Sequence, residues 1–282
     1  MESQLIQNLV ALSLISLMFS LGLNQTFGEI TSLWRQPNLF LRSFLSVVVL
    51  APIIAIIAAL PLPVGSALRG VLLAIAAAPG APLTTKRAVM AGGNFSYAAS
   101  LQVTVSILAM ITVPFWGFVY NAIFPATIIS DPVAVLKAIV TVQVLPISAG
   151  IMIRQILPDI ANKLEPSVTK IANILFIALI LLLLVSTFHL LIGVGATPFI
   201  VSIPVVAIWL VIGHYLGGPN LDERSALAVG SIARNVGLAL LLIQLNVPAD
   251  RMAEILPVLL AFVLVGAVGG IIYSALLKKS PT

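Results

Sequence analysis

Two short segments of the chain combine helix-breaking residues with polar side chains that could bind an anion inside a membrane. In the first segment, 76–94, the helix-breaking residues are Pro79, Gly80 and Pro82. The polar side chains that follow them are Thr84, Thr85, Lys86 and Arg87. Each proline removes a backbone donor and its ring clashes with the preceding turn, so a helix cannot continue unbroken through this segment.

The second segment, 230–237, has the sequence GSIARNVG and the same character. Its polar side chains are Ser231, Arg234 and Asn235, and we expect a helix break that includes Gly237. Backbone groups freed by a break within lipid must be satisfied by protein or by cavity water. We therefore predict that the two segments meet and form a polar site. Its predicted substrate-binding residues are Thr84, Thr85, Lys86, Arg87, Arg234 and Asn235.

Several of these side chains also have a structural explanation that involves no substrate. Arg234 lies roughly 13 Å from the start of its apolar segment, so it either contacts an anion or donates to helix-end carbonyls. Lys86 and Arg87 would be ordinary loop cations if their segment stopped near Thr84. Thr84 and Thr85 could instead cap the half-helix that restarts there, although its N-terminus would itself favour an anion.

We expect the membrane interior to contain cations and no carboxylate. All nine acidic residues fall in loops or at the ends of apolar segments. A cation at a helix centre costs about 2.5–3.5 kcal/mol on insertion scales, so it is tolerated where it faces a cavity and meets a partner. That partner would be carbonyls, water or an anionic substrate. Two amides have similar alternatives: Asn235 could contact substrate or a core helix, and Gln102 could be a ligand or an interhelical hydrogen-bond partner.

The composition shows what kind of molecule must position these groups. The chain has 282 residues, of which 60% are hydrophobic and 8% are charged, with a mean hydropathy of +1.18. Because a soluble domain carries about 25% charged residues, we predict an all-α polytopic membrane protein without a separate soluble domain. The net charge of +5 indicates cytoplasmic loop cations and no nucleic-acid partner. The absence of cysteine excludes disulfides and thiolate metal sites.

Nine apolar segments are long enough to cross about 30 Å of hydrocarbon. The predicted spans are 5–26, 39–60, 66–92, 95–120, 133–153, 170–192, 198–216, 225–246 and 255–277. The first lacks a basic leader and a cleavage site, so we expect it to be retained. Lys and Arg are concentrated in the loops that are cytoplasmic when the N-terminus is outside, which predicts an outside N-terminus and a cytoplasmic C-terminus.

The two broken spans, the third and the eighth, have similar surroundings. Spans one to four and spans six to nine would then be two copies of one unit. In each copy, two spans precede the broken span and one span follows it. The two copies are offset by an odd number of spans and therefore run in opposite senses across the membrane. This pattern predicts the inverted repeat of many secondary transporters, with the binding site where the two broken helices cross.

At these residues the chain resembles the bile acid:sodium symporter family. The segment 17–23, LMFSLGL, is similar to the family's MFxMGL signature, and 233–239, ARNVGLA, is similar to its ARNxGLA form. Pro79-Gly80 with the later Gly93-Asn94 resembles the family's first broken helix. The resemblance implies a panel domain of spans 5–26, 133–153 and 170–192 that rocks against a core domain, 39–120 and 198–277. It also implies transport of small organic anions, usually driven by sodium.

The chain departs from this family at the sodium sites. The family's second site takes a Glu and two Gln, and the matching residues here are Gly230, Arg234 and Val47. The resemblance therefore implies a guanidinium where the family holds a sodium ion. At the other site the matching residues are Thr84, Thr85, Ala98 and Gln102. The predicted ion ligands are Thr84, Thr85, Gln102 and Ser231.

We therefore expect a secondary active transporter of a small organic anion, of the bile-acid or carboxylate type, in the plasma (inner) membrane. Na⁺ is the candidate coupling ion, with altered coupling, and no other cofactor is expected. The alternatives are a sodium-independent uniporter, an exchanger, a proton-coupled carrier or a transporter-derived sensor. An enzyme is disfavoured, because the spans contain no Cys, no acidic residue and no paired His. The predicted partners are the anion and the lipid bilayer.

Overall fold

The computed structural model describes residues 2–124 and 131–279, and all regular elements in these ranges are helical. This confirms the predicted all-α fold class. In chain order the elements are α1 (Glu2–Leu23), α2 (Phe27–Ile30), α3 (Pro37–Phe44), η1 (Leu45–Leu50), α4 (Ala51–Ala59), α5 (Ala67–Ala77), α6 (Thr84–Met90), α7 (Phe95–Ile123), α8 (Pro132–Ile139), η2 (Val140–Val144), α9 (Leu145–Ile156), α10 (Pro158–Gly193), α11 (Thr197–Leu216), α12 (Leu221–Ile232), α13 (Val236–Asn246), η3 (Ala249–Arg251) and α14 (Met252–Lys279).

Within the described ranges, seven helical stretches are long and apolar enough to cross a membrane. They are Pro37–Ala59, Phe95–Ile123, Pro132–Ile156, Pro158–Leu182, Thr197–Leu216, Leu221–Asn246 and Met252–Leu277. The predicted spans 5–26 and 66–92 correspond to shorter apolar helices, Asn8–Leu23 and Ala67–Ala77. The protein is thus a multi-pass membrane protein.

The main difference in boundaries concerns the sixth predicted span, 170–192. The corresponding helix, α10, begins at Pro158. Proline fits the first helical position, where its missing N–H would be unpaired anyway, and Asp159 favours the positive N-terminal end. The helix therefore starts in polar sequence, before the apolar stretch that the prediction was based on.

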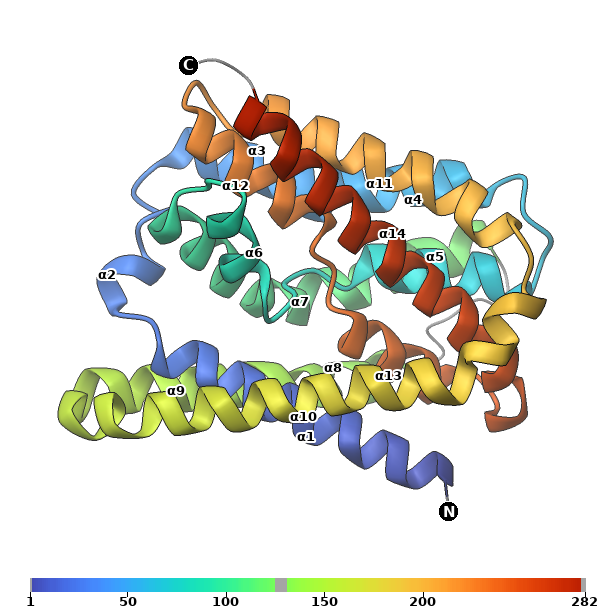
Figure 1. Cartoon of the computed structure of the whole chain (residues 1–282), viewed down its shortest axis with the longest axis horizontal. Helices are drawn as coiled ribbons and strands as arrows, with labels where there is room; N and C mark the ends of the chain where they lie inside the picture. The colour runs from blue at the N-terminus through green and yellow to red at the C-terminus, as the bar shows by residue number, and fades with distance from the viewer. Residues whose placement is uncertain (1, 125–130, 280–282) are drawn as a thin grey trace.

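The helices form two layers (Figure 1). One layer contains α1, α9 and α10, which run side by side at the bottom of the view, and α8 continues through η2 into α9. Glycines bring α1 and α9 into backbone contact. A Cβ atom on Gly22 would lie 2.3 Å from the Ile147 oxygen, and one on Gly150 would lie 2.4 Å from the Phe19 oxygen. The second layer contains the remaining long helices, with α11 packed against both α12 and α14.

Two π-helical turns, η1 and η2, widen the second and fifth long helices near their middle. Each is followed by a proline, Pro52 after η1 and Pro146 after η2. A proline has no N–H for the preceding turn, and in η1 the Ala51 N–H bonds back to the Ser46 oxygen. The Val47 and Val48 carbonyls are thereby released from the α-helical ladder. Such released acceptors are available to side chains from other helices.

Candidate functional site at the helix crossing

The two broken helices cross, and their breaks bond to each other. The first break separates α5 from α6, and the second separates α12 from α13. The Asn235 backbone N–H donates to the Ala78 oxygen at 2.9 Å, and the Ala81 N–H donates to the Ala233 oxygen at 3.3 Å. Backbone groups freed by one break are thus satisfied by the other, as a membrane interior requires. The predicted pair of broken, crossing helices is confirmed.

The first break contains the helix-breaking residues that the sequence indicated. Pro79, Gly80 and Pro82 all lie in the non-helical segment between α5 and α6. Gly80 has a φ of +79°, in the left-handed region that favours glycine. A Cβ atom there would also lie 2.4 Å from the Ser106 hydroxyl of α7, so the break is packed tightly against that helix.

The second break lies earlier in the chain than predicted. It occupies 233–235, whereas Gly237 is helical and lies in the first turn of α13. The physical reason is Asn235, whose Oδ1 accepts the Leu238 N–H at 3.0 Å and so starts the new helix before Gly237. Gly237 instead permits close packing, because a Cβ atom there would lie 2.7 Å from a Leu14 methyl carbon of α1.

Arg234 projects from the second break and is 5% exposed. Its Nη1 donates to the Val47 oxygen of η1 at 2.9 Å and to the Ala76 oxygen near the end of α5 at 3.4 Å. Its guanidinium carbon also lies 4.7 Å from the ring centroid of Trp209. The charge is therefore held by a π-turn carbonyl, the negative end of a helix and an aromatic face.

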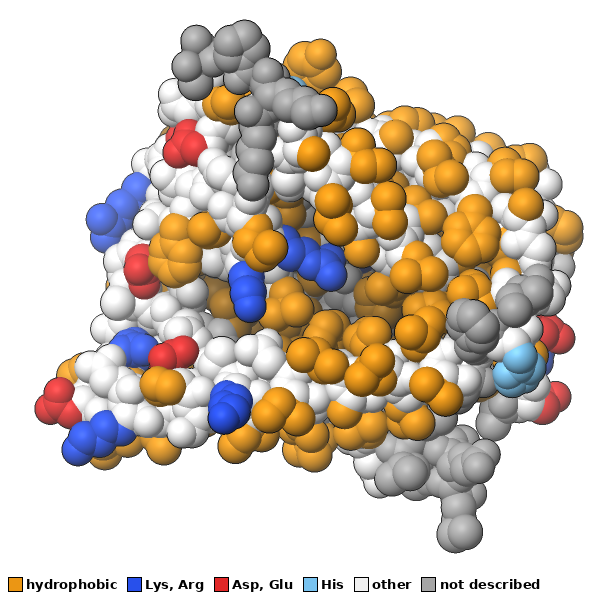
Figure 2. All heavy atoms as spheres, in the orientation of Figure 1, with side chains coloured by type: hydrophobic (Ala, Val, Ile, Leu, Met, Phe, Trp, Pro, Cys, Tyr) orange, Lys and Arg blue, Asp and Glu red, His pale blue; other side chains and the backbone are white. Residues whose placement is uncertain are grey.

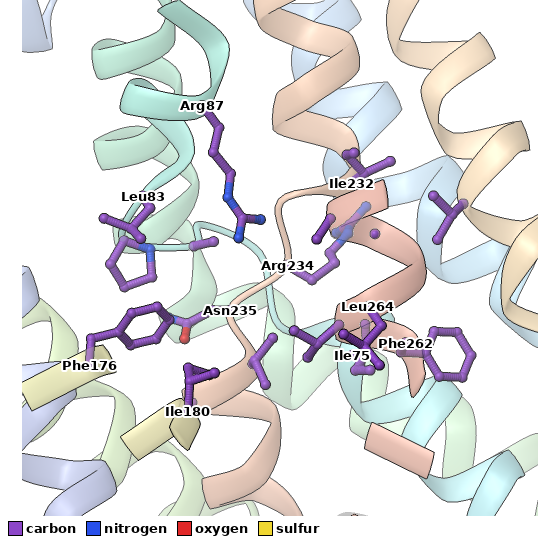
Figure 3. A pocket seen from close by; sticks show the side chains of 18 of the residues that line it. Ile75, Leu83, Arg87, Phe176, Ile180, Ile232, Arg234, Asn235, Phe262 and Leu264 are labelled. Atoms are coloured by element: carbon purple, nitrogen blue, oxygen red, sulfur yellow. The ribbon is translucent and has the colours of Figure 1, made fainter. Parts of the chain in front are cut away.

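Two further nitrogens of this guanidinium, Nε and Nη2, have no hydrogen-bond partner in the described part of the chain. Arg234 lines a cavity of about 400 Å³ that also contains Arg87 and Asn235. Figure 3 shows Arg87 extending from α6 towards the break that carries Arg234. No described acidic residue lines the cavity. The polar end of the cavity therefore carries positive charge without a carboxylate.

The rest of the cavity wall is apolar. Phe176 and Ile180 come from α10, Ile75 comes from α5, and Phe262 and Leu264 come from α14 (Figure 3). The space-filling view shows a hollow on this face, with Lys and Arg side chains in it and hydrophobic side chains around it (Figure 2). The cavity thus lies between the two layers and joins a cationic end to an apolar body.

Asn235 is fully buried and both ends of its amide are bonded within the protein. Its Nδ2 donates to the Gln143 Oε1 at 2.9 Å, while its Oδ1 caps α13. Gln143 in turn donates to the Ser106 backbone oxygen at 2.5 Å. Gln143 was not predicted from the sequence, although a glutamine within an apolar span, shortly before Pro146, is an unusual feature. Of the two alternatives for Asn235, the structure shows the core-helix contact.

Thr84, Thr85 and Gln102 lie together in a closed hydrogen-bond cluster. The Thr85 hydroxyl donates to the Gln102 Oε1 at 2.6 Å, and the Thr85 N–H donates to the same oxygen at 3.0 Å. The Gln102 Nε2 donates to the Pro82 oxygen at 2.7 Å, and the Thr84 hydroxyl donates to the Ala81 oxygen at 2.7 Å. The Gln102 oxygen already accepts two hydrogen bonds, so this cluster fastens α6 and the break to α7.

Two further predicted site residues lie outside the cavity that Arg234 lines. Ser231 donates to the Leu227 oxygen at 2.8 Å and bonds to the Ser46 hydroxyl at 2.8 Å. Lys86 is exposed and lines a second cavity of about 410 Å³ between α1, α6 and α10, opposite Glu165 and Thr169. Leu83 lines both cavities, so the two are adjacent. The structure thus brings Arg87, Arg234 and Asn235 to one cavity. The other cavity is lined by Thr85, Lys86 and Gln102.

A polytopic membrane protein with two crossed, broken helices and a cavity between two helical layers has the architecture of secondary transporters. The chain matches the model of the sodium bile acid symporter family over residues 11–194, which is more than half of its length. It belongs to this family, whose members are transporters. The match ends before α11, so the second broken helix lies outside it. No curated protein matches the chain.

By the sequence resemblance, Arg234 stands at the position matching the family's second sodium site. The Arg234 guanidinium already donates to the Val47 and Ala76 carbonyls there. Two unit charges 4 Å apart repel by about 4 kcal/mol at an effective dielectric constant of 20. No carboxylate among the described cavity residues offsets that repulsion. An ion beside Arg234 would therefore meet a positive charge and no carboxylate ligand among the described residues of this cavity.

Proposed function

We propose that this protein is a secondary active transporter of an organic anion whose charged group binds at Arg234. The observation that carries the proposal is a buried guanidinium with two unpartnered nitrogens, on the wall of a cavity without described acidic residues. A buried donor without a partner is destabilising, and a hydrogen bond to a charged group contributes about 1.5–3 kcal/mol. An anion that enters the cavity would supply the missing acceptor.

The cavity also supports a preference for the rest of the substrate. Arg87 provides a second cation beside the anionic group, and the remaining wall is formed by apolar side chains of α5, α10 and α14. Apolar walls with a few polar groups favour a ligand whose body is apolar and whose orientation is set by one polar end. We therefore propose an organic anion with a substantial hydrocarbon part. Asn235 would support this site indirectly, because its amide bonds hold the second break next to Arg234.

Transport would proceed by alternating access. The predicted panel spans, 5–26, 133–153 and 170–192, correspond to helices of the layer that contains α1 and α10. The cavity lies between this layer and the crossing, so movement of one layer against the other would expose Arg234 to each side in turn. In the plasma (inner) membrane, with the N-terminus outside, the α6 end of the cavity would face the cytoplasm.

The proposed coupling to sodium is altered relative to the family. Arg234 carries a fixed positive charge where a mobile ion would be expected, and the Thr84, Thr85 and Gln102 cluster is already internally bonded. Both observations support weak or absent sodium dependence. A sodium-independent carrier, coupled to protons or working by exchange, is the alternative in the same class.

The test is uptake of a panel of radiolabelled carboxylates into proteoliposomes, in sodium and in choline medium. We expect uptake of at least one carboxylate, little changed by choline, and loss of uptake in the variant Arg234→Ala. The matched control is Arg35→Ala, at an exposed loop arginine, which should transport normally. Wild-type uptake by Arg234→Ala would overturn the assigned site, and strict sodium dependence would overturn the altered coupling.

A further inference from the structure

Gln143 lies where the two layers meet at the helix crossing. It belongs to η2, in the layer that contains α1, α9 and α10, and it is 1% exposed. Along this long helix, α8 and η2 contact α7, whereas α9 packs mainly on α1 and α10. Gln143 thus lies at the position along the α8–η2–α9 helix where its contacts with the other layer end.

Both hydrogen bonds of Gln143 cross between the layers. Its Nε2 donates to the Ser106 oxygen of α7, and its Oε1 accepts from the Asn235 Nδ2 at the second break. Ser106 itself lies against the first break, because its hydroxyl is 2.4 Å from the position of a Cβ atom on Gly80. One amide therefore reaches both breaks, either directly or through the helix packed against it.

The direction of these hydrogen bonds is determined by chemistry. A backbone carbonyl can only accept, so the amide nitrogen of Gln143 must face Ser106 and its oxygen must face Asn235. The Asn235 nitrogen then faces Gln143, and its oxygen is left to cap α13 through the Leu238 N–H. The orientation of Gln143 therefore determines which end of the Asn235 amide starts the helix.

We infer that Gln143 is a positioning residue for transport: it holds Asn235 and the crossing against the first layer in this conformation. Its two bonds must break when the layers separate beside α8. Without them, the conformation that is open along α8 becomes more populated relative to the one seen here. This inference rests on the alternating access of the proposed function. It names Gln143 as a residue that shifts the equilibrium between the two conformations.

The chain contains no cysteine, so single cysteines can report access from each side without background. Leu83→Cys reports on the cavities, which Leu83 lines, and Val135→Cys reports on the fully buried face of α8. Each reporter is combined with Gln143→Leu, which keeps the apolar bulk and removes both hydrogen bonds. The matched control is Gln155→Leu, at an exposed glutamine of the same long helix.

We expect Gln143→Leu to raise maleimide labelling at Val135→Cys and to lower it at Leu83→Cys. The ratio of the two labelling rates should change at least about fivefold, the effect of one lost hydrogen bond on a two-state equilibrium constant. Gln155→Leu should change neither rate. Unchanged labelling in Gln143→Leu would overturn the inference. Labelling needs no substrate, so a wrong substrate or a wrong role for Arg234 would leave this result intact and would show only in uptake.

Gln143→Glu provides the second measurement, including the case in which Gln143→Leu does not fold. A protonated carboxyl can donate to Ser106 and accept from Asn235, as the amide does, whereas an ionised carboxylate can only accept. At acidic pH we expect the labelling of the parent protein, and at alkaline pH the pattern expected for Gln143→Leu. Each labelling rate is divided by the rate of the same single-cysteine protein with Gln143 intact, measured at the same pH. A pH-independent pattern in this variant would contradict the positioning role.

Discussion

At the scale of single residues, the site depends on carbonyl groups that an ordinary helix would not release. The Val47 oxygen accepts from Arg234, and the neighbouring Val48 oxygen accepts from the Trp116 indole N–H at 2.7 Å. Both acceptors are free because Pro52 has no N–H and the turn before it is widened. The cation at the crossing is therefore held by backbone geometry, in a region without a carboxylate among the described cavity residues.

Gly80 gives a residue-scale prediction with an internal control. Gly80→Ala combines an unfavourable φ with a contact 2.4 Å from the Ser106 hydroxyl, whereas Gly92→Ala has a similar φ, +81°, and nothing within 4 Å. Left-handed backbone costs a non-glycine residue roughly 1–2 kcal/mol. We therefore expect both variants to lose stability and Gly80→Ala to lose more, measured as the unfolding midpoint in detergent. Equal losses would show that the break tolerates an added methyl group.

At the scale of elements, the π-turns tie the long helices to the crossing. η1 supplies the carbonyl that holds Arg234, and η2 supplies the side chain that holds Asn235. Each turn precedes a proline in the middle of a span, Pro52 or Pro146. The two prolines therefore shape the site without touching its cavity, since neither is among the residues that line it.

Pro52→Ala tests this role of η1. The substitution supplies an N–H that can bond back to the Val48 oxygen, so the turn should relax towards an α-helix and draw its carbonyls away from Arg234. Loss of one hydrogen bond to a charged group corresponds to about a tenfold effect, and we expect uptake to fall by that order while the helix persists. The control is Pro166→Ala, at an exposed proline inside α10. Normal uptake by Pro52→Ala would contradict the role of the π-turn.

At the scale of the whole molecule, the layer of α1, α9 and α10 is expected to move as one unit. Its helices meet through Gly22 and Gly150, where an added Cβ atom would collide with backbone of the facing helix. Because the backbones of α1 and α9 are already in contact, we expect that these two helices do not slide past each other. Rocking of the layers would then change the contacts at Gln143 and along α10, while the interior of this layer stays constant.

Gly150→Ala tests the tightness of this layer. Its Cβ atom would lie 2.4 Å from the Phe19 oxygen, so α1 and α9 must separate. Overpacking of this kind typically costs 1–3 kcal/mol, so a drop in the detergent unfolding midpoint of at least about 2 °C is expected. Gly266→Ala in α14, where nothing lies within 4 Å of the added atom, should change the midpoint little. Equal midpoints for the two variants would refute rigid packing of α1 on α9.

The sequence predicted the crossing well, because Pro79, Pro82 and Arg234 have no place in an uninterrupted membrane helix. It predicted the partners of these residues poorly. Capping by Asn235 moved the second break ahead of Gly237, and that capping depends on which neighbour takes the other end of the amide. The carbonyl acceptors of Arg234 are invisible to side-chain patterns, and Gln143 becomes significant only when η2 is packed against α7.

The bonds between the two breaks also bear on how the protein is made. The first break, with Ala78 and Ala81, enters the membrane before Ala233 and Asn235 have been translated. During that interval its backbone groups lack their eventual partners, at a cost of several kcal/mol for each group left in hydrocarbon. We therefore expect a nascent chain that stalls before α12 to be retained by the insertion machinery or degraded by quality-control proteases. We therefore expect the first half to reach its final hydrogen bonding only after the second half has been inserted.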